Sequence, residues 1–300
     1  MEAAGVSAKP PRRSVGRRLT DLFHGRRRLQ LGALLAGPVG WLVIAYLGSL
    51  AILFAAAFWS LNDFTGEIEQ SFGFQNFETL WNEDVYHTII FRTIGMAALV
   101  TITDAILAFP IAFYMAKLAT PRMKGFLVVA VLMPLWSSYL VKVYAWRTIL
   151  SEEGALNWFL NPIGLDTPDG GMFRLWLVLS YLWLPFMVIP IYAGLERIPN
   201  TLLSASDDLG ARPFTTFRRV IMPLAFPAIV AGSIFTFSLT LGDYIAVQLV
   251  SSEQFIGNVV YNNVGVANNL PLAAAIALVP VAVMIIYLLG ARRLGAFEHV

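Results

Sequence analysis

The sequence predicts an all-α integral membrane protein with six transmembrane helices. Its 300 residues are 57% hydrophobic and only 13% charged, and its mean hydropathy is +0.67, a composition outside the usual range of soluble globular domains. A helix needs ~20 mostly apolar residues to cross a bilayer. Six stretches meet this requirement: 31–59, 92–116, 126–150, 174–195, 228–250 and 272–291. An even number of crossings leaves both termini on one side of the membrane.

The distribution of charge indicates which side that is. Lys and Arg are retained on the cytoplasmic face, and here they cluster in residues 1–30 and in the loops after the second and fourth stretches, whereas the other loops carry acids. We therefore expect both termini in the cytoplasm. Residues 1–30 form a basic tail that suits anionic lipid headgroups better than nucleic acid. Its basic residues are Lys9, Arg12, Arg13, Arg17, Arg18, Arg26, Arg27 and Arg28.

The first two spans differ in polarity. Glycine and proline in the first span, 31–59, are tolerated when neighbouring groups satisfy the freed backbone. The second span, 92–116, contains Asp104, which lies ~18 Å along the helix from Arg92 at 1.5 Å per residue, close to the bilayer midplane. An ionisable group at that depth faces protein or a water-filled cavity. Asp104 is therefore either a buried acid bonded to a neighbouring helix or part of a transport path.

The third and fourth spans are rich in aromatic residues and proline. In the third span, 126–150, Tyr139, Lys142 and Trp146 share one helical face, and an interfacial aromatic belt explains most of the rings. The fourth span, 174–195, carries Trp183 together with two prolines that favour bending.

The fifth span, 228–250, contains the polar sequence Gly242-Asp243-Tyr244. A glycine followed by an acid inside an apolar run predicts a broken or widened helix of the kind that lines transporter cavities. A chance polar residue near the outer interface is the alternative. The sixth span, 272–291, is uniformly apolar.

A polar insert, "LLSASDDLGARPFTTFRRVIMPLAFP", separates the fourth and fifth spans. Gly210 fits the C-terminal cap of one short helix, and Pro213 fits the first turn of a second helix over about 213–222 that ends at Pro223. Residues 200–223 thus form a helical hairpin, and the aromatic rings of Phe214 and Phe217 suit a groove on another protein. The chain contains no nucleotide-binding phosphate loop, so a partner that hydrolyses nucleotide would explain the hairpin.

The insert resembles the EAA loop of permease subunits of bacterial ABC importers, whose pattern is E-A-A, three residues, G, nine residues, I-x-L-P. Aligned on Gly210, the chain gives Ser204-Ala205-Ser206 and then Val220-Ile221-Met222-Pro223, without a gap. Ser204 stands where the family has Glu, which leaves Asp207 or Asp208 as the acidic contact. "YLWLPFMVIPIYAGLERIP" and "LGDYIAVQLV" extend the resemblance to the spermidine/putrescine-type permeases, over roughly residues 30 to 295.

The resemblance implies the six-helix fold of type I (MetI-like) ABC importer permeases in the bacterial inner membrane, within residues 31–295. It also implies a non-catalytic subunit that works with a second permease, two ATPase subunits that bind ATP and Mg²⁺, and an external substrate-binding protein. The hairpin would dock on the ATPase through Ser204, Ala205, Ser206, Asp207, Asp208, Gly210, Ala211, Pro213, Phe214, Phe217 and Pro223.

A polyamine substrate would favour acids and aromatic faces along the path, because cation–π contacts reach ~2 kcal/mol when desolvated. Candidate path residues are Asp104, Tyr139, Trp183, Asp243 and Tyr244, whereas Lys142 would repel a cation. Another small solute, or an ion-gradient-driven secondary transporter, is the alternative; a membrane-embedded enzyme would need a polar cluster that the spans lack. The absence of cysteine and the scattered histidines predict no metal site, and no cofactor is expected on this chain.

Overall fold

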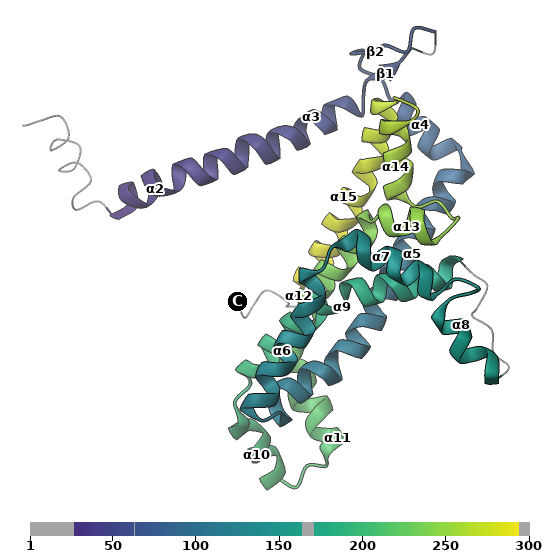
Figure 1. Ribbon diagram of the computed structural model, residues 1–300. Coiled ribbons are helices and arrows are strands. Elements are labelled where there is room, and N and C mark those ends of the chain that lie inside the picture. The colour runs from purple at the N-terminus through teal and green to yellow at the C-terminus, as the bar shows by residue number, and fades with distance from the viewer. Residues whose placement is uncertain (1–26, 63, 164–170, 294–300) are drawn as a thin grey trace, which may run out of the picture. The chain divides into compact units, whose positions relative to one another are not determined.

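The computed structural model describes residues 27–62, 64–163 and 171–293, and this part of the chain is mainly helical (Figure 1). Five of the described helical segments are long and apolar enough to cross a membrane: Leu34–Ala56, Asp84–Leu118, Gly171–Arg197, Pro213–Gly242 and Leu270–Arg293. The number rises to six if the bent pair of helices between the second and third of these counts as one span. The all-α membrane architecture is thereby confirmed.

The chain divides into two units, Met1–Ala55 and Ala56–Val300. The first contains α2 (Arg27–Trp41), a π-helical stretch η1 (Leu42–Leu47) and most of α3 (Gly48–Ala56). The described residues of this unit form a single apolar helix with no core of its own, so its apolar surface must be covered from outside the unit. Most of the basic tail predicted for residues 1–30 lies outside the described residues.

Three helices form the core of the second unit: α5 (Asp84–Phe113), α9 (Gly171–Arg197) and α12 (Met222–Gly242). They pack against one another along their lengths (Figure 1), and a π-helical turn η2 (Tyr114–Leu118) extends α5. Small residues allow α9 and α12 to approach closely, since a Cβ atom on Gly194 would lie 2.3 Å from the Cβ of Ala228. Close backbone approach through small residues is typical of helix packing in membranes.

The segment between the two units' long helices is partly ordered by polar contacts. Strands β1 (Ser60–Leu61) and β2 (Ile68–Glu69) pair antiparallel, and helix α4 (Gln75–Asn82) follows them. The side-chain amide of Asn76 donates to the carbonyl oxygens of Ala57 and Trp59 at 2.9 and 2.8 Å. This segment is therefore fixed against the chain that precedes it.

The third predicted span, 126–150, is not one continuous helix. It consists of α6 (Pro121–Trp136) and α7 (Tyr139–Ile149), which meet at 93°. The carbonyl oxygen of Pro134 is released at the bend and accepts hydrogen bonds from Ser137 Oγ at 2.8 Å and Lys142 Nζ at 3.0 Å. The two serines at 137 and 138 supply the non-helical backbone, and α8 (Ala155–Leu160) and the 3₁₀ turn η3 (Asn161–Ile163) follow α7.

The fifth predicted span, 228–250, is interrupted where the sequence predicts and begins earlier than predicted. Helix α12 stops at Gly242 and the chain resumes in α13 (Ile245–Val250), which confirms the predicted interruption. At its other end the apolar segment starts at Pro213, because α12 continues from α11 (Pro213–Thr216) and the π turn η4 (Phe217–Ile221). The remaining helices are α10 (Asn200–Asp208), α14 (Ile256–Gly265) and α15 (Leu270–Arg293).

The contact of α9 with α12 can be tested at Gly194. We expect Gly194→Ala to lower the free energy of unfolding by about 1–3 kcal/mol, because the added methyl group overpacks a rigid contact. The measurement is the thermal midpoint of the permease complex purified in detergent. Gly290→Ala is the control, since a Cβ at Gly290 meets nothing within 4 Å. Equal midpoints for both variants would contradict the close approach.

Candidate functional site

The turn of the hairpin at 200–223 forms as its sequence predicts. Gly210 has φ +71°, a conformation that glycine adopts without steric cost. The N–H of Ala211 donates to the carbonyl of Ser206 at 3.1 Å, and the N–H of Gly210 to that of Asp207 at 2.8 Å. Pro213 is the first residue of α11, and both predicted signals are therefore confirmed.

The two arms of the hairpin are joined by a buried hydrogen bond of 2.8 Å between the hydroxyls of Ser206 and Thr216. Ser206 therefore stabilises the hairpin from inside. The tip of the hairpin exposes two large apolar side chains, Leu209 (87% exposed) and Phe214 (71%), next to the exposed acids Asp207 and Asp208. Leu209 is not among the docking residues predicted from the sequence, although its position directly before the capping glycine places it at the tip.

Phe217 and Pro223 differ from their predicted environments. Phe217 is half-buried, and its ring meets the ring of Phe109 on α5 edge-on, with centroids 5.4 Å apart. The second arm does not end at Pro223: it runs through η4 into α12 as one helical segment, Pro213–Gly242. Proline removes one helical hydrogen bond, and the π turn just before it accommodates the loss. The hairpin is thus continuous with a core helix.

Polar contacts also fix the first arm. Lys117 Nζ, at the end of η2, donates to the carbonyl of Ile198 at 2.5 Å and to the side chain of Asn200 at 3.3 Å. Lys124 on α6 pairs with Glu196 on α9 and lies 5.4 Å from the ring centroid of Tyr192. The hairpin is therefore anchored to the ends of α5, α6 and α9.

A pocket of about 360 Å³ lies at the break between α12 and α13. The hydroxyl of Tyr139 donates to Asp243 Oδ2 at 2.5 Å, and the ring of Tyr139 stacks on that of Trp183, with centroids 5.9 Å apart and planes at 24°. Tyr244 also lines the pocket. The structure thus brings together Tyr139, Trp183, Asp243 and Tyr244, four of the five residues predicted along the path.

Asp243 has both oxygens engaged. Its Oδ1 accepts the backbone N–H of Ala246 at 3.0 Å and so caps α13, while its Oδ2 faces Tyr139. Ser238, Leu239, Gly242 and Ile245 complete the pocket. Ser238 and Leu239 precede Gly242 and Asp243 by one helical turn, so helical spacing alone could have found them.

Asp104 does not line this pocket. It is fully buried on α5, and neither of its carboxylate oxygens has a hydrogen-bond partner among the described residues. Its polar neighbour is Ser180 on α9, whose hydroxyl is also unpaired in this part of the chain. Lys142 is likewise absent from the pocket, because its amine is held by the carbonyl of Pro134. A role of Asp104 in the path stays a prediction.

The sequence profile of the family described as "Binding-protein-dependent transport system inner membrane component" matches residues 90–295, which include the hairpin and the pocket. The chain belongs to this family. It is an ABC importer permease of the multi-pass inner-membrane type, and the predicted family resemblance is confirmed.

Two curated relatives extend the match. The chain is 45% identical to the inner membrane ABC transporter permease protein YdcU of Escherichia coli (strain K12), with 99% of each chain covered. It is 33% identical to the spermidine/putrescine transport system permease protein PotB of Salmonella typhimurium (strain SL1344), over 74% of this chain and 78% of the relative.

Among solved structures, this permease is similar to a chain of a bacterial ABC transporter involved in the import of the acidic polysaccharide alginate. The TM-score is 0.73 and the identity is 19%, with 95% of this chain and 99% of that chain covered. At this identity the likeness shows the fold alone, which is that of type I ABC importer permeases.

The bond between Tyr139 and Asp243 can be tested by Tyr139→Phe. We expect the free energy of unfolding of the permease complex to fall by about 1–3 kcal/mol, because a buried carboxylate oxygen loses its donor. Thermal unfolding of the purified complex measures this. Tyr144→Phe, at an exposed tyrosine of the same helix, is the control; equal losses in both variants would show that the bond contributes nothing.

Proposed function

We propose that this chain is the permease subunit of an ATP-driven importer that carries a small organic cation, with a polyamine as the best candidate. The observation that carries the proposal is the pocket at the helix break, where the Asp243 carboxylate lies among the rings of Tyr139, Trp183 and Tyr244. A carboxylate with aromatic faces around it is suited to an ammonium group, which gains both charge pairing and cation–π contact.

The relatives support this substrate class in part. PotB of Salmonella typhimurium is named for spermidine and putrescine, whereas the name of the more similar YdcU of Escherichia coli specifies no substrate. Another small polar solute is therefore the second candidate. One observation favours it: both oxygens of Asp243 already accept hydrogen bonds from the protein, so the pocket can hold a neutral polar molecule without an unpaired charge.

The remaining subunits and the orientation belong to the same proposal. A second, related permease completes the path, two ATPase subunits bind ATP and Mg²⁺, and an external binding protein delivers the solute. This chain binds no cofactor, performs no catalysis and has both termini in the cytoplasm. The exposed Leu209 and Phe214 at the hairpin tip, with Asp207 and Asp208 beside them, support docking in an apolar groove with a basic rim.

The continuity of the hairpin with α12 supports a mechanism of coupling. The segment Pro213–Gly242 has 30 residues and is therefore about 45 Å long. One end carries the hairpin, and the other end carries Asp243 and the pocket. A displacement of the hairpin when the ATPase closes would move the pocket without passing through a flexible loop, which suits alternation between two global states.

Asp243→Asn tests the pocket. We expect ATP-dependent uptake of spermidine at low concentration to fall about tenfold or more, because asparagine keeps the cap of α13 but lacks the charge. Uptake by vesicles that contain the complete transporter is the measurement, and Glu153→Gln, at an exposed acid, is the control. Unchanged spermidine uptake would overturn the cation proposal, and loss confined to a neutral solute would favour the second candidate.

Gly210→Ala tests the hairpin. An alanine at φ +71° is strained by ~1–2 kcal/mol, so we expect the turn to shift and the solute imported per ATP hydrolysed to fall about fivefold. Gly210→Asn is the matched control, because asparagine tolerates the left-handed conformation. ATP hydrolysis and uptake are measured on the same vesicles. An unchanged ratio in Gly210→Ala would contradict a coupling role for this turn.

A further inference from the structure

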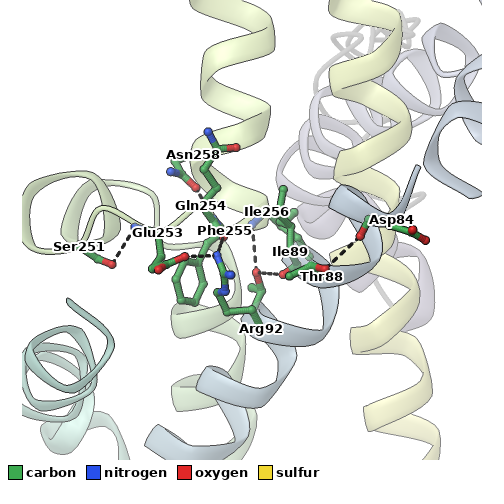
Figure 2. A network of polar contacts seen from close by, with 11 residues as sticks. Asp84, Thr88, Ile89, Arg92, Ser251, Glu253, Gln254, Phe255, Ile256 and Asn258 are labelled. Carbon is green, nitrogen blue, oxygen red and sulfur yellow. Dashed lines mark hydrogen bonds and ion pairs between the residues drawn. The ribbon is translucent and has the colours of Figure 1, made fainter. Parts of the chain in front are cut away.

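The segment that joins α13 to α14, residues 251–255, is attached to α5 by an ion pair (Figure 2). Arg92 Nη1 lies 2.5 Å from Glu253 Oε2 and 3.4 Å from the carbonyl oxygen of Gln254. The side chains of Arg92 and Glu253 are 27% and 42% exposed. The ion pair is therefore the partly exposed end of this attachment.

Buried hydrogen bonds continue the attachment inward from the ion pair. The N–H of Ile256 donates to Thr93 Oγ1 at 3.1 Å, and that hydroxyl donates to the carbonyl of Ile89 at 2.7 Å. The N–H of Phe255 donates to Asn258 Oδ1 at 2.6 Å, and the ring of Phe255 is almost fully buried. The bond from Ile256 to Thr93 therefore fixes the start of α14 on α5, and the bond from Phe255 to Asn258 orders the first turn of α14 itself (Figure 2).

The same segment touches the helix break at Asp243 from two directions. Along the chain, α13 begins at the cap that Asp243 provides and ends directly before Ser251. Through space, a Cβ atom on Gly257 would lie 3.0 Å from the carbonyl oxygens of both Gly242 and Asp243. Only glycine lets α14 pass so close to this backbone.

We propose that residues 251–257 are a positioning segment. While the exposed Arg92–Glu253 ion pair is formed, this segment holds the Gly242–Asp243 break, and with it the pocket, in place. Separation of Arg92 from Glu253 releases the break and opens the pocket. Arg92, Glu253 and Gly257 act through Asp243 and do not touch the transported molecule. The effect on transport rests on the proposed function, whereas the connection between the ion pair and the pocket does not.

The link is tested by the accessibility of the pocket to thiol reagents. The natural chain has no cysteine, so Ser238→Cys, which places a thiol in the lining of the pocket, provides one labelling site. The experiment uses the complete transporter in membrane vesicles and a membrane-impermeant methanethiosulfonate reagent. We expect Glu253→Gln and Gly257→Ala each to raise the labelling rate about two- to fivefold, the scale of a partly exposed ion pair.

Matched variants separate this link from general damage to the fold. Glu67→Gln removes an exposed acid elsewhere, and Gly265→Ala adds a methyl group on the same helix where nothing lies within 4 Å; both should label at the parent rate. The double variant Arg92→Glu with Glu253→Arg exchanges the two charges and should label at the parent rate. Either change alone should raise the labelling rate. A parent rate in Glu253→Gln and Gly257→Ala, or equal rises in the controls, would overturn the proposal.

The labelling result does not depend on what the transporter carries. Raised labelling together with normal spermidine uptake by Asp243→Asn would overturn the proposed substrate path and leave the positioning segment standing. Unchanged labelling together with lost uptake by Asp243→Asn would overturn the positioning segment and leave the proposed substrate path standing. The two proposals can therefore fail separately.

Discussion

A backbone N–H or C=O group that is released where a membrane helix is interrupted finds no water in the hydrocarbon, and each unpaired group costs several kcal/mol. Two interruptions within the described residues meet that constraint with side chains. Ser137 and Lys142 bond the carbonyl of Pro134 at the bend between α6 and α7, and Asp243 caps α13 after Gly242. The polar residues at these sites are required by the breaks, and at Asp243 the same residue also gives the pocket its charge.

The hairpin and the helix break at Gly242 are linked by an unbroken helical path. At one end the segment begins in the hairpin at Pro213, and at the other it stops at Gly242. Glycines at 194 and 232 bring α9 and α12 into close contact between these points, so the pair can transmit force without much internal deformation. The positioning segment at residues 251–257 attaches the far end of this path to α5. The pocket therefore lies where the helical path from the hairpin meets the segment that is attached to α5.

The buried acid of the core contrasts with the acid of the pocket. Asp104 lies between α5 and α9 without a hydrogen-bond partner among the described residues, whereas Asp243 is bonded from two sides and lines a pocket. A hydropathy profile does not distinguish the two aspartates, because each is a single acid in an apolar span. The difference arises from the neighbouring elements: Tyr139 is supplied by α7, which turns away from α6 at 93°.

Local patterns in the sequence determined the apolar spans, the Gly210 turn, Pro213 at the start of a helix and the break at Gly242, because each depends on residues within a few positions of one another. Tertiary structure alone decided the bend that divides residues 126–150, the passage of the helix through Pro223, and the pocket. The bond from Tyr139 to Asp243 joins residues 104 positions apart. The periodicity of the sequence does not predict such a contact, because the packing of α7, α9 and α12 brings the two side chains together.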